Sequence, residues 1–315
     1  MEYVRGAENI AADHRGCVAS VGNYDGLHPG HRKVIRSLVE RGRELNLPVA
    51  IVSFDPHPME FFVPDAAPPR LMTTQEKCEA MQGLDVDIFC CLEFNHELAN
   101  TEPEEFIENL LIDKLKVQYV VVGDDFRFGR NRRGNFQMLR SICQRYGIEV
   151  AKTVTLEMGG ERVSSTRIRE CLAAGDVARA NRLLGREFSM SGNIIRGDGN
   201  AKNWGFATAN VQVKVPKPAL TGVFVVEADL PGNASLPAVA SLGTRPTVGG
   251  TKPVLEVHLL DFDDDIYDEH IRVRFLKKLR DEVKFASIET MCEQIQQDIT
   301  RTREYFGQKH SRIAS

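Results

Sequence analysis

The sequence lacks the features of membrane and exported proteins. No run of apolar residues approaches the length of a membrane span. The first 15 residues mix acidic and basic side chains without an apolar core, so we expect no signal peptide. Seven cysteines, an odd number without a CxxC pair, predict neither a disulfide framework nor a zinc site. We therefore expect a cytoplasmic protein with no membrane partner.

An excess of basic residues is also missing. The formal net charge is −4, so we expect no nucleic-acid partner. An apolar content of 42% and a charged content of 27% are typical of a soluble globular protein. A length of 315 residues favours two domains over one. We expect small-molecule substrates and a monomer or a weak oligomer.

Strand-like and helix-like stretches alternate over residues 15–185. The expected strands are 17–21, 48–54, 88–92 and 119–122, and the expected helices are 31–45, 74–83, 103–115, 135–146 and 166–184. Continuous apolar strands between helices predict a parallel, Rossmann-like sheet that is covered on both faces. Ligands of such sheets lie beyond the carboxyl ends of the strands. Residues 1–185 are therefore predicted to form an α/β domain with its site at that edge.

The stretch Gly22–His31 joins the first of these strands to a helix. Pro29 suits the first helical turn, and the unpaired N–H groups at a helix start form an anion site. Glycines let the backbone approach a ligand, and two histidines three residues apart can face one phosphate. The alternative is a tight turn with two surface histidines. The predicted phosphate-binding residues here are Gly22, Asn23, Asp25 and Gly30, and the predicted catalytic residues are His28 and His31.

Polar strings follow two other strands and open a further helix. Asp55–Pro58 leaves the second strand, and Gly123–Gly129 leaves the fourth with carboxylates and aromatic rings. The arginines within 130–133 form either a solvated charge run or a phosphate site. Hydroxyl residues at a helix start cap it, and together with two arginines they also make a second phosphate site. That site comprises Ser164, Ser165, Thr166, Arg167 and Arg169.

The pattern changes after residue 185. Short strand-like runs with turn residues between them predict a small antiparallel β-barrel. A final apolar stripe predicts a closing helix over 287–306. The expected barrel strands are 188–196, 207–213, 222–230, 237–243, 253–262 and 270–279. Residues 186–315 are therefore predicted to form the second domain.

Three features of the predicted barrel carry chemistry. The glycine-containing loop 197–205 is able to close over phosphates. Thr208 and Asn210 lie on one face of a strand, where their oxygens can share one Mg²⁺ with substrate phosphates. Glu256 lies on an otherwise apolar strand face, and a carboxylate there suits a general base for a hydroxyl. The alternatives are a hairpin turn, a strand edge and a satisfied core glutamate.

These strings resemble those of one family. GNYDGLHPGH at 22–31 resembles the HxGH signature of the nucleotidyltransferase superfamily, and SSTRIR at 164–169 is similar to its second signature, ISSTxIR. GNAKNWGFATAN at 199–210 looks like the riboflavin kinase loop GRGRxLGFPTAN. Together the strings resemble the bacterial bifunctional riboflavin kinase/FMN adenylyltransferase (FAD synthetase) family over nearly the whole chain.

The resemblance implies two reactions. It implies that the barrel phosphorylates riboflavin to FMN with ATP and Mg²⁺, with Glu256 as the base. It also implies that the first domain adenylylates FMN to FAD with a second ATP and releases pyrophosphate. The implied nucleotide-binding residues of the barrel loop are Gly197, Gly199 and Lys202, and the implied flavin-binding residues are His57, Asp125, Phe126, Phe128 and Arg280.

Three other functions stay open at the level of sequence. The barrel loop has Ala201, Lys202 and Ala207 where the family has glycine, arginine and proline, so one alternative is an adenylyltransferase with an impaired kinase barrel. A second is a transferase for another phosphate ester that uses the barrel as a binding module. A third is a nucleic-acid-binding or flavin-sensing protein that uses the arginines within 127–133, although the acidic balance weighs against it.

Overall fold

The computed structural model describes four stretches of the chain: residues 1–196, 208–232, 235–247 and 250–313. The chain divides into two compact units. The first comprises Met1–Pro68 and Thr74–Ser164, and the second comprises Pro69–Thr73 and Ser165–Ser315. None of the helices in the described stretches has the length and apolarity that crossing a membrane requires.

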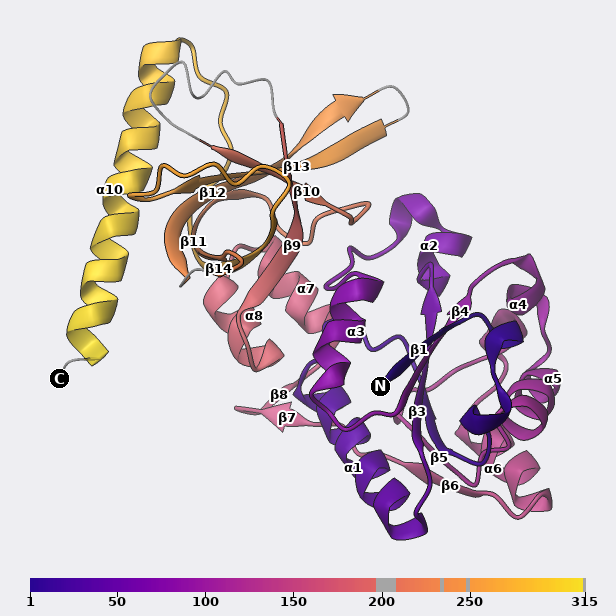
Figure 1. The fold of residues 1–315 in the computed structure, drawn as a ribbon. Coiled ribbons are helices and arrows are strands. Elements are labelled where there is room, and N and C mark those ends of the chain that lie inside the picture. The colour runs from indigo at the N-terminus through magenta and orange to yellow at the C-terminus, as the bar shows by residue number, and fades with distance from the viewer. Residues whose placement is uncertain (197–207, 233–234, 248–249, 314–315) are drawn as a thin grey trace. The chain divides into compact units, whose positions relative to one another are not determined.

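A six-stranded parallel sheet forms the centre of the first unit (Figure 1), as the alternating pattern predicted. Its strand order is β1-β4-β3-β2-β5-β6. The strands are β1 (Glu2–Arg5), β2 (Val18–Val21), β3 (Val49–Asp55), β4 (Ile88–Glu93), β5 (Tyr119–Val122) and β6 (Glu149–Lys152). The four predicted strands are the four central ones. The two edge strands were not predicted because they are short and partly polar.

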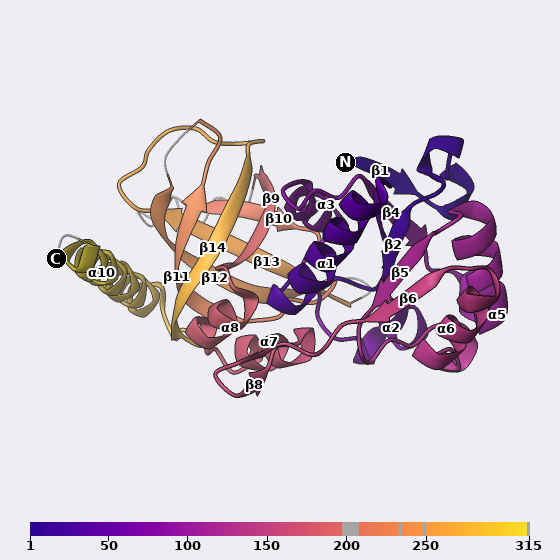
Figure 2. The ribbon, with the colours of Figure 1, turned by 90° about the horizontal axis from the view of Figure 1, so that it is seen from below.

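Helices cover both faces of this sheet (Figures 1 and 2). On one face, α1 (Pro29–Leu45) packs against β2, β3 and β5, with α3 (Thr74–Gln82) beside it. On the other face, α6 (Phe136–Arg145) and a π-helix, η4 (Phe106–Lys114), share one hydrophobic core with the sheet. These helices confirm the predictions for 31–45, 74–83 and 135–146. The predicted helix 103–115 is present as a short α5 (Pro103–Glu105) that continues into η4.

Short elements that the periodicity did not predict complete the first unit. The α-helices are α2 (Pro58–Phe62) and α4 (His96–Asn100), and the hairpin strands are β7 (Glu157–Met158) and β8 (Glu161–Arg162). The 3₁₀ turns are Ala7–Asn9, Ala12–His14, Pro64–Ala66 and Arg130–Arg132. Elements of two to five residues are too short to show a helical or strand period.

The predicted single helix over 166–184 is wrong. The segment forms two helices, α7 (Ser165–Ala173) and α8 (Val177–Leu184). Gly175 between them has a φ of +76°, which ends a helix, and Asp176 accepts a hydrogen bond from the N–H of Arg179 at 3.1 Å as the cap of α8. Both helices belong to the second unit, where α8 packs against β9 and β14.

The second unit is built around a closed antiparallel barrel, which confirms the predicted architecture. Its strand order is β10-β13-β12-β11-β14-β9. The strands are β9 (Phe188–Ile195), β10 (Ala209–Val213), β11 (Gly222–Asp229), β12 (Leu236–Thr247), β13 (Gly250–Leu259) and β14 (His270–Arg280). The rings of Phe188, Phe224 and Phe275 are fully buried together. The closing helix α10 (Ile288–Ile313) packs Ile299 against Val223 and Val239.

Candidate active site

The start of α1 brings the two predicted catalytic histidines together. Their rings stack with centroids 3.7 Å apart and an interplanar angle of 17°. The N–H of His31 donates a hydrogen bond to Nδ1 of His28 at 3.3 Å, which makes His28 the N-cap of the helix. Because Nδ1 accepts this hydrogen bond, the neutral ring carries its proton on Nε2. The buried His28 therefore presents an N–H donor at a helix start that already favours anions.

The turn between β2 and α1 is held in a costly conformation. Tyr24 and Leu27 have φ values of 50° and 44°, and such conformations cost non-glycine residues on the order of 1–3 kcal/mol each. The buried Tyr24 hydroxyl donates to Oγ of Ser20 at 2.5 Å, and that hydroxyl donates to the carbonyl of Val121 at 2.5 Å. Burial raises the pKa of Tyr24 above its usual range, so its hydroxyl remains a donor. Strain of this kind persists where the surroundings fix the backbone.

The predicted phosphate-binding residues of this stretch belong to the same turn. Gly22, Asn23 and Asp25 lie between β2 and α1, and Asp25 is buried. Gly30 lies in the first turn of α1. A Cβ atom at Gly30 would lie 3.1 Å from the His28 ring, which is closer than side chains normally pack. Glycine at this position therefore leaves the space that the His28 ring occupies.

At the end of β3, hydrogen bonds with the backbone fix the predicted flavin residue His57. The peptide bond before Pro56 is cis, and His57 caps α2. Nδ1 of His57 accepts a hydrogen bond from the N–H of Met59 at 3.1 Å, and the N–H of His57 donates to the carboxylate of Glu60 at 3.2 Å. The neutral imidazole therefore carries its proton on Nε2.

An aromatic surface that was not predicted lies in and around α2. It consists of Phe54, Phe61, Phe62, Phe94 and His96. Three of these phenylalanines contact one another at centroid distances of 5.4, 5.5 and 5.6 Å. Phe62 is 55% exposed. Because exposed aromatic rings suit a planar ligand, this surface is a binding candidate. Its signals in the sequence were the adjacent Phe61 and Phe62 and, just after the third expected strand, Phe94.

The two predicted aromatic residues after β5 have different environments. The rings of Phe126 and Phe128 stack at 5.1 Å with an interplanar angle of 21°. Phe128 is buried in the core of the first unit, where it contacts Phe106 at 5.6 Å. Phe126 is only partly buried. Phe128 therefore packs against Phe126 from the core side, and Phe126 is the ring closer to the surface.

The carboxylates after β5 hold an arginine that was not predicted as a site residue. Nη2 of Arg162, from β8, donates to the predicted flavin residue Asp125 at 3.0 Å and lies 3.5 Å from Asp124. The hydroxyl of Thr155 also donates to Asp124, and this hydrogen bond is the main cause that lowers the pKa of the Asp124 carboxyl. The loop after β5 therefore carries a guanidinium as well as carboxylates.

Two of the following arginines form surface ion pairs. Arg130 and Arg133 lie 3.4 and 3.2 Å from the carboxylate of Glu102. Exposed pairs of this kind contribute little stability. Asn135 caps α6, since its Oδ1 accepts a hydrogen bond from the N–H of Met138 at 3.1 Å. These contacts favour a solvated charge run over a phosphate site for the two arginines.

The second predicted phosphate site lies at the start of α7. Its residues are Ser164, Ser165, Thr166, Arg167 and Arg169. Within the second unit, Nε of Arg169 donates to the carbonyl of Pro69 at 2.7 Å. Arg167 pairs with Glu170 on the same helix at 2.7 Å. The Pro69 carbonyl therefore fixes the guanidinium of Arg169.

In the barrel, strand register aligns a predicted metal ligand with the predicted base. Asn210 of β10 lies directly opposite Glu256 of β13, which lies directly opposite Ser241 of β12. Residues paired in this way share one face of the sheet. Leu255 and Val257 on either side of Glu256 are fully buried, so Glu256 lies on the outer face of the barrel. Across the sheet, an amide and a hydroxyl side chain therefore flank the Glu256 carboxylate.

Glu282, next to this row, was not predicted as a site residue. The hydroxyl of Ser241 donates to its carboxylate at 3.3 Å. A Cβ atom at Gly243 would overlap that carboxylate, so the glycine leaves it space. The predicted flavin residue Arg280 uses Nε and Nη2 to hold the buried Asp298 of α10 at 2.9 and 2.8 Å. Arg280 therefore ties the end of β14 to the closing helix.

The remaining predicted residues of the barrel precede β10 in the sequence. Thr208 directly precedes β10, two positions before Asn210. Gly197, Gly199 and Lys202 lie outside the described residues.

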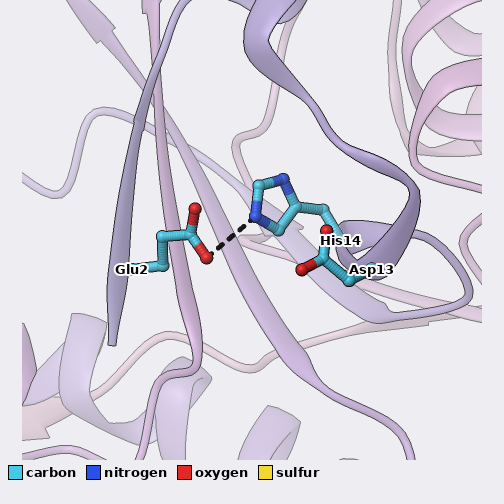
Figure 3. A group of neighbouring side chains, drawn as sticks. All are labelled: Glu2, Asp13 and His14. Carbon is cyan, nitrogen blue, oxygen red and sulfur yellow. Dashed lines mark ion pairs between the residues drawn. The ribbon is translucent and has the colours of Figure 1, made fainter.

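One group of carboxylates and imidazole in the described part of the chain is close enough together to hold a metal ion: Glu2, Asp13 and His14 (Figure 3). Nε2 of the buried His14 lies 3.0 Å from the carboxylate of Glu2. The N–H of Ala11 donates to Nδ1 of His14 at 2.9 Å, so the neutral ring carries its proton on Nε2, the atom nearest to the Glu2 carboxylate. A metal requires a lone pair at that atom. The group therefore fits a contact that fastens the edge strand β1 better than a metal site.

Comparisons with known proteins match both halves of the chain to known families. A model of the FAD synthetase family matches residues 10–167, and a model of the riboflavin kinase family matches residues 184–306. The bifunctional riboflavin kinase/FMN adenylyltransferase of Escherichia coli (strain K12) is 42% identical over 308 residues, with 98% of each chain covered. The protein of the same name from Pseudomonas fluorescens is 45% identical over 304 residues, which cover 96% of this chain and 97% of that protein.

A solved structure has a similar fold. A crystal structure described as a macrolide-efflux protein from Streptococcus pneumoniae matches with a TM-score of 0.81 at 26% sequence identity, covering 96% of this chain and 99% of that one. The two family models and the full-length relatives assign the chain independently of that description. The chain belongs to the bifunctional riboflavin kinase/FMN adenylyltransferase family.

Proposed function

We propose that this chain carries out both reactions for which its family is named, in functional domains 1–185 and 186–315. The second phosphorylates riboflavin with ATP, and the first adenylylates the resulting FMN with another ATP to give FAD. The stacked imidazoles of His28 and His31 at the start of α1 are the observation that carries the proposal. The row Asn210–Glu256–Ser241 supports the kinase half.

In adenylyl transfer, a phosphate oxygen of FMN forms a bond to the α-phosphorus of ATP. The bond from that phosphorus to the bridging oxygen breaks, and pyrophosphate leaves with the electron pair. His28 donates from Nε2 to the α-phosphate, where negative charge develops, and the N–H groups at the start of α1 stabilise the same charge. His31 supports the ring of His28 by stacking. Arg167 and Arg169, with the hydroxyl residues at the start of α7, form a second phosphate site.

The flavin ring binds on the aromatic surface beside His57. The partly buried Phe126 provides a further aromatic face, with Phe128 stacked behind it. Asp125 holds Arg162, whose guanidinium suits the phosphate of FMN. The aromatic rings supply most of the contact area, while the charged pair fixes the orientation of the ligand.

In riboflavin phosphorylation, Glu256 removes the proton of the terminal ribityl hydroxyl. The hydroxyl oxygen attacks the γ-phosphorus of ATP, and ADP leaves. The hydroxyl of Thr208 and the amide oxygen of Asn210 fit Mg²⁺, which prefers hard oxygen ligands in a partial protein shell. When bound, Mg²⁺ neutralises charge on the ATP phosphates. Gly197, Gly199 and Lys202 are the proposed phosphate-binding residues of this domain. Arg280, whose guanidinium is held by Asp298, is its proposed flavin-binding residue.

Removal of divalent cations with EDTA is expected to abolish FMN formation from riboflavin and ATP, and added MgCl₂ is expected to restore it. Asn210→Ala removes one of the two oxygen ligands, so the MgCl₂ concentration for half-maximal activity should rise about tenfold, the effect of losing roughly 1.4 kcal/mol of binding. Titrating MgCl₂ into the assay measures this. An unchanged Mg²⁺ requirement in the variant would place the metal elsewhere.

Gly30→Ala is expected to lower the rate of FAD formation from FMN by about 10- to 100-fold, because small displacements of a catalytic group have effects of this size. The new Cβ atom forces the His28 ring to move by a few tenths of an ångström. Gly83→Ala is the control, since nothing lies within 4 Å of its new methyl group. Both variants should form FMN from riboflavin at the wild-type rate, and an unaffected Gly30→Ala would contradict the role of His28.

A product assay tests the whole proposal. The purified chain, incubated with riboflavin and ATP, should form FMN first and then FAD, with one pyrophosphate released for each FAD. Chromatography that resolves FMN from FAD measures both. FAD from added FMN without any FMN from riboflavin would leave only the adenylyltransferase, and the absence of both products would contradict the proposal.

We also propose that the chain works on small molecules as a monomer or a weak oligomer in the cytoplasm. The structure contains no disulfide among the seven cysteines, all of which lie in the described residues, and this supports a reducing compartment. Size-exclusion chromatography with light scattering measures the oligomeric state.

A further inference from the structure

A buried lysine contacts the phosphate turn from outside the predicted site. Lys77 lies on α3 and is only 6% exposed. Its Nζ donates to the carbonyl oxygen of Asn23 at 3.2 Å. The hydroxyl of Ser53, at the end of β3, donates to the same oxygen at 3.2 Å. One carbonyl of the turn between β2 and α1 therefore accepts hydrogen bonds from two side chains of two other elements.

Burial restricts the ammonium group of Lys77 to contacts within the fold. Desolvating an ammonium group is unfavourable, so its contacts with the protein must offset that cost. The turn that it holds is itself strained, with left-handed conformations at Tyr24 and Leu27. The Tyr24–Ser20–Val121 hydrogen bonds fix the turn on one side. The hydrogen bonds to Asn23 fix the residue just before the strained Tyr24.

The ammonium group of Lys77 provides a stronger hydrogen bond than the Ser53 hydroxyl, and it also provides a positive charge. A hydrogen bond from a charged donor is roughly twice as strong as one between neutral groups. In addition, a charge in a poorly hydrated interior is weakly screened and acts over several ångströms. Lys77 is thus a buried positive charge one hydrogen bond away from the turn that leads to His28.

We propose that Lys77 is a positioning residue for adenylyl transfer. Through the Asn23 carbonyl it holds the turn in the conformation that aims the N–H groups at the start of α1 and Nε2 of His28 at the phosphates of ATP. Its charge adds to the attraction of this turn for the triphosphate. The inference rests on the proposed function, because it assigns ATP to this turn.

The test compares Lys77→Met with three other variants of the full chain. Lys77→Met keeps most of the apolar stem and removes the charge, and Lys77→Arg keeps the charge. Ser53→Ala removes the neutral donor alone. Lys116→Met removes one positive charge from an exposed position before β5, at the opposite end of the strands from the turn. Each variant is assayed for FAD formation from FMN over a range of ATP concentrations, and riboflavin phosphorylation by the same chain serves as the internal control.

The proposal expects a specific pattern. In Lys77→Met, kcat/KM for ATP in FAD formation should fall by about tenfold or more, with a raised KM, because a charged hydrogen bond is lost. Lys77→Arg should recover most of that loss, and Ser53→Ala should lose less than Lys77→Met. Lys116→Met should match the wild type. All four variants should phosphorylate riboflavin at the wild-type rate.

Two results would overturn the proposal. One is a Lys77→Met variant with wild-type kcat and KM for ATP. The other is a variant that loses kcat at unchanged KM in proportion to a smaller folded fraction, since a purely structural role predicts that pattern. A calorimetric titration of ATP gives a readout that is independent of turnover. In Lys77→Met, the affinity of the adenylyltransferase site for ATP should fall about tenfold, and the affinity of the kinase site should not change. If the wild type formed no FAD, the proposed adenylyltransferase function would be wrong. The ATP titration would still show whether Lys77 contributes to ATP binding at this turn.

Discussion

His28→Ala is expected to lower the rate of FAD formation from FMN and ATP by at least about 10²-fold, because losing one donor to a developing negative charge has effects of that size. FMN formation from riboflavin should be unchanged. The reason is the tautomer of His28. Its Nδ1 accepts the N–H of His31, so the proton on Nε2 is the donor that a phosphate can use. Alanine removes this donor without altering the barrel. Chromatographic assay of FAD and FMN from the two substrates separately measures both activities.

His28→Asn separates the chemistry from the structure. His28 also caps α1, and alanine at an N-cap costs about 1 kcal/mol of stability. Asparagine is a good N-cap, so this variant should melt close to the wild-type temperature and still lose FAD formation, because its shorter amide lies away from the position of Nε2. A folded His28→Asn that makes FAD at nearly the wild-type rate would contradict the donor role. So would a variant that loses both activities equally.

The turn at residues 22–31 was predictable because its signals are local. A continuous apolar strand, three glycines, a proline at the first helical position and two histidines all lie within 15 residues of one another. The structure places β2, the turn and α1 as expected, with His28 and His31 stacked at the join. Local hydrogen-bonding chemistry at a helix start leaves few alternative conformations.

Elements whose stability comes from their neighbours were not predictable. β1 and β6 read EYVR and EVAK, which show no strand period, and they are strands because the edges of the sheet offer unpaired backbone groups. The break between α7 and α8 did leave a signal in Gly175 and Asp176, a helix end followed by a helix cap. There the helical period on both sides concealed the break.

The contacts across strands and between elements were the least accessible to sequence reasoning. Spacing placed Thr208 and Asn210 on one face, but only the register of β10, β13 and β12 aligns Asn210, Glu256 and Ser241. Likewise, nothing within 74–83 distinguishes Lys77 from a solvent-exposed lysine. Its role follows from a contact with Asn23, 54 residues away along the chain.

Glu256→Gln is expected to lower kcat for FMN formation from riboflavin by about 10²–10⁴-fold, since general base catalysis contributes that much. FAD formation from added FMN should be unchanged. Glutamine keeps the size of the side chain between Asn210 and Ser241 but cannot accept the proton of the ribityl hydroxyl. Glu269→Gln is the matched control, because it makes the same chemical change at an exposed position. A Glu256→Gln variant with nearly wild-type kcat would assign the base to another residue, and Glu282 is the carboxylate to test next.

Mixing the two inactive variants decides whether the two sites act independently. Alone, His28→Ala should stop at FMN, and Glu256→Gln should form nothing from riboflavin. Together they should form FAD from riboflavin and ATP, because FMN made on the barrel of one chain diffuses to the intact stacked histidines of the other. The rate of FAD formation should rise with the concentration of either variant, since the intermediate passes through solution. If the mixture makes FMN but no FAD, although Glu256→Gln adenylylates added FMN, then FMN does not leave the chain that made it, and the two sites are not independent.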